Sequence, residues 1–362
     1  MISIAAPTFG PAERDAVAEV MEDGRVADGP VVRSFEDEFA AVCGVEHGVG
    51  MGNGTLALHA ALEALDVGPG DTVVTTPFSF VASANAIRLA GATPAFADID
   101  PETFALDPGE TEQRVRDTDA DAILAVHLYG LPAEMAALVD VAEDAGIPLV
   151  EDAAQAHGAE YGGDPVGSFG DAAAFSFYPT KNMSTGEGGM VVTDREDVAQ
   201  RAASFANHGR TQGGGYEHER LGSNYRMTSI AAAIGRVQLG KLAGWVQARR
   251  SNAARLSEAL AQVPGIQAPI EPRGRTHAYH QYTVRTERRE RLRDELAGEG
   301  VDTAIYYPTP IHRLGAYDGF DADAPVADRA ASEVLSLPVH PGLSEADIET
   351  ITAALEKSTV EA

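Results

Sequence analysis

Lys181 is the residue of this chain whose type and position most clearly suggest covalent chemistry. It is one of only three lysines in 362 residues, and it lies between an apolar run at 175–177 and a glycine-rich segment at 186–189. The other two, Lys241 and Lys357, lie in stretches typical of solvated helices. A lysine amine, unlike an arginine, condenses with an aldehyde to form a Schiff base. The position therefore suggests the lysine of a pyridoxal 5'-phosphate (PLP) site, and a lysine on a surface loop is the alternative.

The segment Gly52-Asn53-Gly54-Thr55 predicts a place for the phosphate of such a cofactor. It follows a predicted strand and opens a predicted helix. Gly54 lets the backbone approach an anion closely, and a helix N-terminus offers free N–H groups and a favourable dipole. The hydroxyls of Thr55 and Ser176 can reach the same phosphate. An ordinary helix start has similar features, so this signal is weak alone. The glycines at 186–189 are better explained by a tight turn with positive φ angles.

Asp152, Gln155 and Phe80 are candidates for contacts with the pyridine ring. Asp152 and Gln155 follow a predicted strand at 148–150, and ligands of open α/β sheets bind beyond the carboxyl ends of the strands. The Asp152 carboxylate can pair with a protonated pyridine nitrogen and preserve the electron-sink character of the ring. Gln155 can hydrogen-bond the phenolic oxygen, and Phe80 can stack on the ring. A helix-capping Asp152 and a Phe80 in the core are the alternatives.

The charge and cysteine content exclude several kinds of partner. The formal net charge is −28, from 55 acidic and 27 basic residues, and such a field repels nucleic acids and anionic lipid surfaces. The single cysteine, Cys43, excludes an internal disulfide and a cysteine metal cluster, and we predict no metal site. No apolar run approaches the roughly 20 residues that span a bilayer, and the first residues lack the features of a secretory signal. We therefore expect a cytoplasmic protein that binds small molecules.

Alternating apolar runs and helical stretches indicate an α/β fold. Between about 45 and 195, short apolar runs predict strands at 48–51, 72–76, 93–97, 122–126, 148–150, 172–177 and 190–193. Helical patterns lie at 11–23, 31–43, 55–65, 81–90 and 133–145. Continuously apolar strands are typical of a largely parallel sheet that is covered on both faces. We therefore predict a large domain, 1–262, with a mostly parallel seven-stranded sheet.

A smaller unit is predicted at the C-terminal end. A long helical stretch at 228–261 leads to Pro264-Gly265, and we expect a small α+β domain at 263–362. Its predicted elements are strands at 279–285 and 303–307 and helices at 288–298 and 345–355.

The order of these motifs resembles the DegT/DnrJ/EryC1/StrS family. The resemblance runs from about residue 3 to residue 355. Its motifs are Asn53-Gly54-Thr55, Glu151-Asp-Ala-Ala-Gln-Ala-His-Gly158, Phe175-Ser-Phe177, Lys181 with the glycines at 186–189, and Leu221-Gly-Ser-Asn-Tyr-Arg-Met-Thr228. The lysine and Asp-x-x-Gln segments are highly specific, and the Gly-Thr segment is less so. Members are fold-type-I PLP-dependent aminotransferases that act on nucleotide-linked keto-sugars. The resemblance implies that fold, cofactor and activity for this chain.

The resemblance also implies a role for each candidate residue. Lys181 would form the internal aldimine and shuttle the proton, Asp152 would hold the pyridine nitrogen, and Gln155 would hold the phenolic oxygen. The family builds its sites at a homodimer interface, where Asn224 would reach the phosphate bound by the partner subunit. The remaining phosphate and ring contacts would come from Gly54, Thr55, Ser176 and Phe80.

The implied reaction moves an amino group from L-glutamate to a nucleotide-diphospho-4-keto-6-deoxy-sugar. The 4-keto preference rests on segments 127–130 and 184–189, which resemble the perosamine-synthase type. Ser223, where members often carry tyrosine, and Pro179-Thr180 depart from the family pattern without removing a catalytic group. The alternatives are an aminotransferase of a non-sugar ketone such as a cyclitol, a different PLP reaction, and a non-catalytic regulatory member. Polar candidates for the substrate pocket, without assigned chemistry, are His157, Tyr178, Tyr307 and His312.

The acidic composition predicts a protein that needs salt. The acids are spread along the chain, so we expect an acidic surface whose self-repulsion destabilises the folded state unless ions screen it, to within about 3 Å at 1 M salt. Such a surface is typical of a halophilic host with a salty cytoplasm. The thermal unfolding midpoint should therefore rise steadily from dilute buffer to molar KCl. Full stability in dilute buffer would contradict this prediction.

Overall fold

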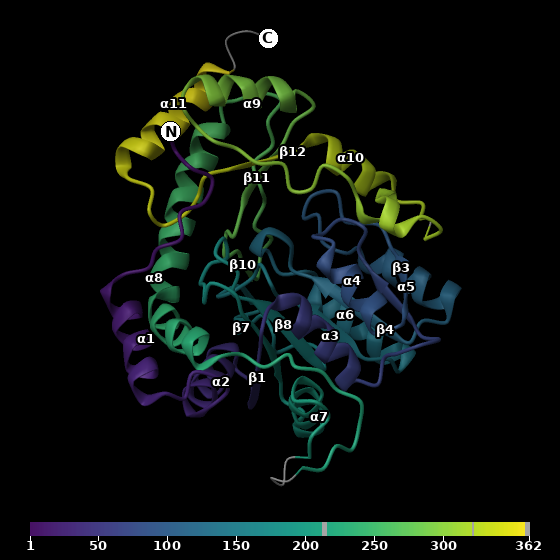
Figure 1. The fold of residues 1–362 in the computed structure, drawn as a ribbon. Helices are drawn as coiled ribbons and strands as arrows, with labels where there is room; N and C mark the ends of the chain where they lie inside the picture. The colour runs from purple at the N-terminus through teal and green to yellow at the C-terminus, as the bar shows by residue number, and fades with distance from the viewer. Residues whose placement is uncertain (212–215, 321, 359–362) are drawn as a thin grey trace.

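The computed structural model of the protein describes residues 1–211, 216–320 and 322–358. A seven-stranded sheet forms its centre, with the strand order β1-β9-β8-β5-β4-β2-β3 (Figure 1). β9 is antiparallel to both of its neighbours, and the other pairs are parallel. The predicted α/β class with a mostly parallel seven-stranded sheet is confirmed. The strands are β1 His47–Met51, β2 Thr72–Thr75, β3 Thr93–Phe96, β4 Ala122–Val126, β5 Leu149–Asp152, β8 Ala172–Ser176 and β9 Gly189–Thr193.

The central strand β4 is apolar throughout because successive side chains enter two different cores. In β4, Leu124 and Val126 pack into the core under α3 and α7, whereas Ile123 and Ala125 pack into the core under α5 and α6. Helices therefore cover both faces of the sheet, as expected for parallel strands. The bounds of these helices are α3 Gly54–Ala64, α5 Pro108–Thr118, α6 Met135–Ala145 and α7 Glu196–Ala206.

Most of the predicted helices are present, and three helices have no counterpart among the predictions. The helices α1 Pro11–Asp23, α2 Pro30–Cys43, α4 Ala82–Leu89 and α6 confirm predicted segments. The helices without a counterpart are α5, α7 and α10 Pro325–Glu333. In α5 only Thr111 and Val115 are buried. The segment therefore has too few apolar residues at helical spacing for its sequence to predict a helix.

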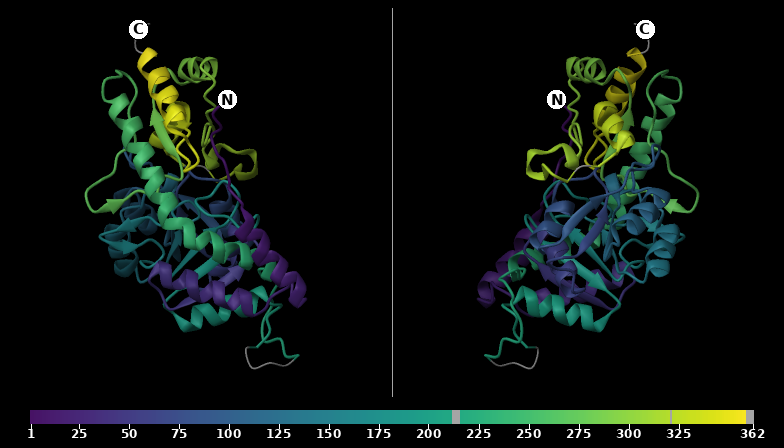
Figure 2. Two further views of the ribbon diagram at one scale, coloured as in Figure 1. Left: turned by 90° about the vertical axis from the view of Figure 1, so that its left-hand side faces the viewer. Right: turned by 90° about the vertical axis from the view of Figure 1, so that its right-hand side faces the viewer.

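The long helix α8 Ser229–Leu260 connects the sheet to the C-terminal region (Figures 1 and 2). Near its start, Lys241 forms an ion pair with the buried Glu13 of α1, and Gln238 Nε2 donates to the same carboxylate (2.7 Å). Burial acts to raise the pKa of Glu13, but these hydrogen bonds outweigh burial and lower the pKa to about 2. Lys241 therefore holds α1 on α8, which corrects the expectation of an ordinary solvated lysine.

The C-terminal region contains an antiparallel pair of strands and its own apolar core. β11 Tyr282–Arg285 pairs antiparallel with β12 Val334–Leu337, and α9 Arg289–Gly298 and α11 Glu345–Lys357 pack with them. Because Leu256 and Leu260 of α8 also belong to this core, the helix contributes to both regions. The division into domains 1–262 and 263–362 stays a prediction.

Two strand predictions in this region need correction. The predicted strand at 279–285 begins only at Tyr282, because Tyr279 has a positive φ of 45°. The predicted strand at 303–307 is wrong. Ala304 alone bridges to Ser336 of β12, and the chain then turns toward the large cavity described below, which Tyr306 and Tyr307 line. The strand that pairs with β11 is β12.

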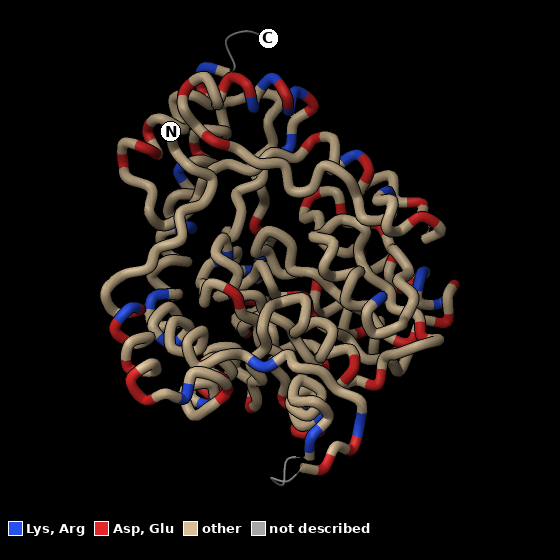
Figure 3. Tube along the Cα trace, viewed as in Figure 1, with Lys and Arg blue, Asp and Glu red and all other residues tan. Residues whose placement is uncertain are grey.

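Short elements complete the chain. β6 Glu160–Tyr161, β7 Asp164–Pro165 and β10 Arg275–Thr276 form a small sheet, and 3-10 turns lie at Leu128–Gly130, Ile311–Arg313 and Gly315–Tyr317. Acidic residues are distributed over the outer helices and loops, and most basic residues lie among them (Figure 3). In the described part of the chain, no helix is both long and apolar enough to cross a bilayer.

Two glycines of α8 provide a matched test of this packing. A methyl group at Gly235 would lie 2.6 Å from the Phe35 ring, whereas a methyl group at Gly240 would meet nothing within 4 Å. We expect Gly235→Ala to lower the free energy of unfolding by about 1–3 kcal/mol through overpacking. Gly240→Ala should raise it by about 0.5–1 kcal/mol through helix propensity. Denaturant unfolding in molar KCl measures both, and equal effects would contradict the packing of α8 on α2.

Candidate active site

A cavity of about 730 Å³ lies at the C-terminal ends of the parallel strands. Val126, Asp152 and Ser176, the last residues of β4, β5 and β8, line it. Asn224 is the one predicted site residue outside it, because Asn224 is exposed and bridges to Asn207. The predicted site residues that line the cavity are Gly54, Thr55, Phe80, Asp152, Gln155, Ser176 and Lys181.

Asp152 presents a buried carboxylate to this cavity. Its Oδ2 accepts a hydrogen bond from the Ser83 hydroxyl (2.7 Å), and its Oδ1 accepts one from the Ala154 N–H (3.2 Å). Burial raises the pKa of Asp152, and the opposing hydrogen bonds and the charge of Lys181 do not cancel the rise. A buried acid next to a lysine in a cavity is typical of functional sites. Ser83 is a site residue that the sequence did not reveal.

Glu151, the residue before Asp152, faces the other side of the sheet, because successive strand residues point to opposite faces. Its carboxylate accepts hydrogen bonds from His127 Nε2 (2.9 Å) and from backbone N–H groups within 167–170 (2.8–2.9 Å). Burial acts to raise the pKa of Glu151, but these hydrogen bonds outweigh burial and lower the pKa. Glu151 therefore stabilises the loop before β8, and only Asp152 is available to a ligand.

Lys181 lies in the cavity wall without an acidic partner. The other two lysines are paired, Lys241 with Glu13 and Lys357 with Glu299 (2.9 Å). Among the described residues, no carboxylate forms an ion pair with Lys181. Burial lowers the pKa of Lys181 to about 8, and the nearby Asp152 only partly opposes this. About a tenth of the amine is thus unprotonated at pH 7, far more than for an ordinary lysine, and this is the nucleophilic form.

The N-terminus of α3 and Ser176 form a narrow cradle. The helix begins at Gly54, and Asn53 caps it by accepting a backbone N–H of the first turn (3.0 Å). The first N–H groups of a helix have no intrahelical acceptor. A Cβ at Gly54 would lie 2.6 Å from Ser176 Cβ, and a Cβ at Gly189 would lie 2.4 Å from the Asn53 carbonyl oxygen. Both glycines are therefore required by close approach, and the cradle suits a phosphate.

Gln155 is held by two tyrosines that are distant in sequence. Its Oε1 accepts the Tyr129 N–H (2.7 Å), and its Nε2 donates to the Tyr307 hydroxyl (3.0 Å). The Tyr129 hydroxyl donates to the Tyr306 carbonyl oxygen. These hydrogen bonds fix the orientation of the Gln155 amide, and its second N–H is left for a ligand. They also tie residues 306 and 307 to the cavity wall.

The remaining aromatic and histidine candidates separate into two groups. Phe80 is 54% exposed, and its ring centroid lies 6.0 Å from that of Tyr307, so it is available for stacking on a ligand. Tyr178 and Tyr307 also line the cavity. His157 and His312 do not line it: His157 packs against aromatic rings at 39, 175 and 177, and His312 lies 3.4 Å from Asp328.

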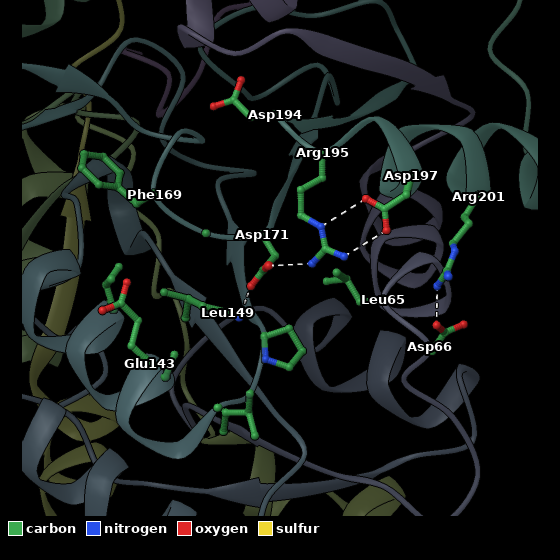
Figure 4. Close-up of a pocket in the computed structure, with 16 residues that line it drawn as sticks. Leu65, Asp66, Glu143, Leu149, Phe169, Asp171, Asp194, Arg195, Asp197 and Arg201 are labelled. Carbon is green, nitrogen blue, oxygen red and sulfur yellow. Dashed lines mark hydrogen bonds and ion pairs between the residues drawn. The ribbon is translucent and has the colours of Figure 1, made fainter.

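A second cavity, of about 630 Å³, lies at the opposite end of the strands (Figure 4). Both of its arginines are paired with acidic side chains, as the dashed lines of Figure 4 show. Arg195 pairs with Asp171 (2.8 Å) and Asp197 (3.0 Å), and Arg201 pairs with Asp66. The first cavity differs because its lysine has no such partner. We therefore place the functional site there.

The residues of the first cavity fit PLP. The cradle at Gly54 and Ser176 suits the phosphate, and a Cβ at Gly54 would fill that space. Asp152 offers a carboxylate to the pyridine nitrogen, and Gln155 retains an N–H for the phenolic oxygen. Lys181 offers an amine to the aldehyde. Each part of the cofactor therefore has a chemically matched group in one cavity.

Comparison with known proteins gives a consistent family assignment. The model of the DegT/DnrJ/EryC1/StrS aminotransferase family matches residues 7–356. A pleiotropic regulatory protein of Geobacillus stearothermophilus is 42% identical over 333 residues, covering 90% of this chain and 89% of the relative. The dTDP-3-amino-3,4,6-trideoxy-alpha-D-glucose transaminase of Streptomyces venezuelae is 42% identical over 337 residues (92% and 88%). The GDP-perosamine synthase of Caulobacter vibrioides is 37% identical over 367 residues (99% and 98%).

Solved structures agree with these sequence relatives. The crystal structure of S. venezuelae DesV has a TM-score of 0.93 and 39% identity, and the match covers 97% of this chain and 95% of that one. The PLP form of Spr1654 from Streptococcus pneumoniae has a TM-score of 0.92 and 27% identity, with 99% and 98% covered.

The environment of Lys181 predicts unusual reactivity. Its amine should react with an amine-directed reagent such as trinitrobenzenesulfonate with a pH midpoint near 8, instead of its ordinary pKa of 10.5. Because the charge of Asp152 raises the pKa of Lys181, Asp152→Asn should shift the midpoint to lower pH. Mass spectrometry of the modified Lys181 peptide measures both in the cofactor-free protein. A midpoint near 10.5, or a shift to higher pH in the variant, would contradict this account.

Proposed function

This chain belongs to the DegT/DnrJ/EryC1/StrS aminotransferase family, and we propose that it moves an amino group from L-glutamate to a nucleotide-diphospho-4-keto-6-deoxy-sugar. The protein is a PLP-dependent enzyme of the sugar-aminotransferase family. One observation carries the proposal: Lys181, the unpaired lysine, lies in the same cavity as Asp152 and the Gly54–Ser176 cradle.

When bound, PLP supplies an aldehyde that accepts an amine and a ring that withdraws electrons from the reacting carbon. We propose that Lys181 is the amine to which the cofactor attaches and the base that moves the proton between the reacting carbons. Its pKa of about 8 suits both tasks, because an acid–base catalyst works best near the operating pH. The amine is unprotonated often enough to abstract a proton and protonated often enough to return one.

Asp152 is proposed to hold the proton of the pyridine nitrogen. Ser83 orients its carboxylate (2.7 Å), and burial strengthens its interaction with a cationic partner. Gln155 is proposed to bind the phenolic oxygen, and Phe80 to stack on the ring. Gly54, Thr55 and Ser176 are proposed to bind the phosphate.

The ring position of the keto group has two candidates. The sequence of segments 127–130 and 184–189 supports a 4-keto acceptor. The S. venezuelae relative is named for a 3-amino sugar, which favours a 3-keto acceptor as the second candidate. The resemblance to a named regulatory protein keeps the non-catalytic alternative, and a cyclitol ketone is a further one.

The assembly and its surroundings are also part of the proposal. We propose a homodimer with shared sites, in which Asn224 acts on the partner's cofactor phosphate. Its exposure and its place outside the cavity of its own chain support this role. We further propose that the enzyme works in a salty cytoplasm, which the charge of −28 supports.

Absorbance of the purified protein with PLP in molar KCl tests the half-reaction. We expect a visible band of the lysine-bound cofactor that L-glutamate removes while 2-oxoglutarate is released. Lys181→Ala should bind PLP without that band and lose at least about 10³-fold in turnover, because it removes both the attachment point and the proton shuttle. Paired 3-keto and 4-keto nucleotide sugars then identify the acceptor. A band that glutamate leaves unchanged would exclude the proposed donor, and wild-type turnover by Lys181→Ala would exclude the mechanism.

Subunit mixing tests the shared site. Lys181→Ala and Asn224→Ala dimers should each be impaired. After subunit exchange, half of the dimers are mixed and each has one intact site, so about a quarter of wild-type activity should return. Mixing Lys181→Ala with Asp152→Asn is the control, because both residues line the cavity of the same chain. Each mixed dimer of the control has one site without Lys181 and one without Asp152, so no activity should return. Equal recovery in both mixtures would therefore contradict a special role of Asn224 across the interface.

A further inference from the structure

Arg249 is a buried cation to which the proposed reaction has so far given no role. It lies on α8 and is 6% exposed. Its Nη1 donates to the carbonyl oxygens of Tyr279 (3.0 Å) and His280 (3.3 Å), whereas its Nε is buried without a hydrogen-bond partner. In the described ranges, no carboxylate forms an ion pair with it. A buried charge without a counter-charge is costly, so this arrangement needs an explanation.

Neighbouring arginines are paired in the ordinary way. Arg250, the next residue of α8, forms two hydrogen bonds with Glu271, both of 2.9 Å. The largely buried Arg275 and Arg285 pair with glutamates. Since the chain contains 55 acidic residues, acids are not scarce, and the missing partner at Arg249 is a local feature of this position.

Arg249 lies next to the catalytic lysine. Both line a small cavity of about 30 Å³, and Lys181 also lines the main cavity. Burial together with the charge of Lys181 lowers the pKa of His157 to about 3 and that of His280 well below its ordinary value. Both nearby histidines are therefore neutral near pH 7. These histidines therefore leave the charge of Arg249 without a counter-charge.

An amino-acid donor brings a carboxylate to this place. The donor nitrogen must reach the cofactor atom that the Lys181 amine reaches, and in an α-amino acid the carboxylate is bonded to the same carbon as that nitrogen. Among the described residues that line the two cavities, Arg249 is the only arginine and Lys181 the only lysine. The small cavity has about the volume of one water molecule in the liquid, so only the carboxylate end of a donor would enter it.

We propose that Arg249 binds the α-carboxylate of the amino-acid donor, an inference that rests on the proposed function. The two backbone carbonyls hold Nη1 and leave the edge formed by Nε and Nη2 for the carboxylate. That edge forms two parallel N–H···O hydrogen bonds with a carboxylate. The unpaired Nε and the missing acid then have one explanation, because the donor supplies the counter-charge during the first half of the reaction.

Calorimetry with 2-oxoglutarate tests this site without turnover. This keto acid has the carboxylates of glutamate but no amine to transfer, so it binds the PLP-loaded enzyme without reaction. Arg249→Met should raise its Kd by about 30-fold, the effect of losing a charge-assisted hydrogen-bond pair. Arg250→Met removes a neighbouring arginine of the same helix and should leave the Kd within about twofold, as expected for a surface ion pair. The glutamate concentration that half-saturates bleaching of the PLP band should rise with the Kd, while the limiting rate changes less.

The outcomes separate this inference from the proposed function. Unfolding curves and the PLP band establish that the variants are folded. If Arg249→Met does not fold, Arg249→Lys keeps the charge but loses the two-donor edge, and it should raise the Kd by about tenfold. Unchanged 2-oxoglutarate affinity in a folded Arg249 variant, or equal losses in the Arg250 control, overturns the carboxylate site even when glutamate bleaches the wild-type band. A wild-type band that does not respond to glutamate overturns the proposed function instead.

Discussion

The site depends on one physical constraint, the removal of the Lys181 amine from water at the ends of the parallel strands. Burial lowers the pKa of Lys181 to about 8, although Asp152 attracts its charged form. An ion pair with an acid at the surface would have the opposite effect, because it would stabilise the protonated amine. The two other lysines show this ordinary arrangement with Glu13 and Glu299. The cavity therefore keeps Lys181, the amine that we propose to react, free of such a partner.

The strands provide this environment through the alternation of their side chains. At the end of β5, Asp152 faces the cavity and Glu151 faces the opposite side, where His127 and backbone N–H groups satisfy it. Two adjacent acidic residues thus make different contacts, because their side chains lie on opposite faces of the sheet. One stabilises a loop, and the other stays available to a cationic ligand beside the Ser83 hydroxyl.

Charged residues of α8 also differ in whether they have a partner of opposite charge. Near its start, Lys241 is neutralised by Glu13, and further along, Arg250 is neutralised by Glu271. Arg249 precedes Arg250 on the helix. Its Nη1 donates to the carbonyl oxygens of Tyr279 and His280, and its Nε has no hydrogen-bond partner. We propose that a cation without an acidic partner in the wall of a cavity identifies where an anionic ligand or a reacting group belongs. Lys181 and Arg249 are two such residues, and they line one small cavity.

The sequence by itself determined the family, the parallel sheet and the strand ends at which Gly54, Asp152, Ser176 and Lys181 gather, because these depend on local apolar runs and short motifs. Only the tertiary structure decided what holds those groups. Ser83 orients Asp152, and Tyr129 and Tyr307 orient Gln155, through contacts between segments up to 152 residues apart. It also decided that residues 303–307 form no strand and that Tyr306 and Tyr307 line the cavity, and that Gly189 is needed for its approach to Asn53. Such contacts leave no local pattern in the chain, since hydrogen-bond partners and burial are set by which segments the fold brings together.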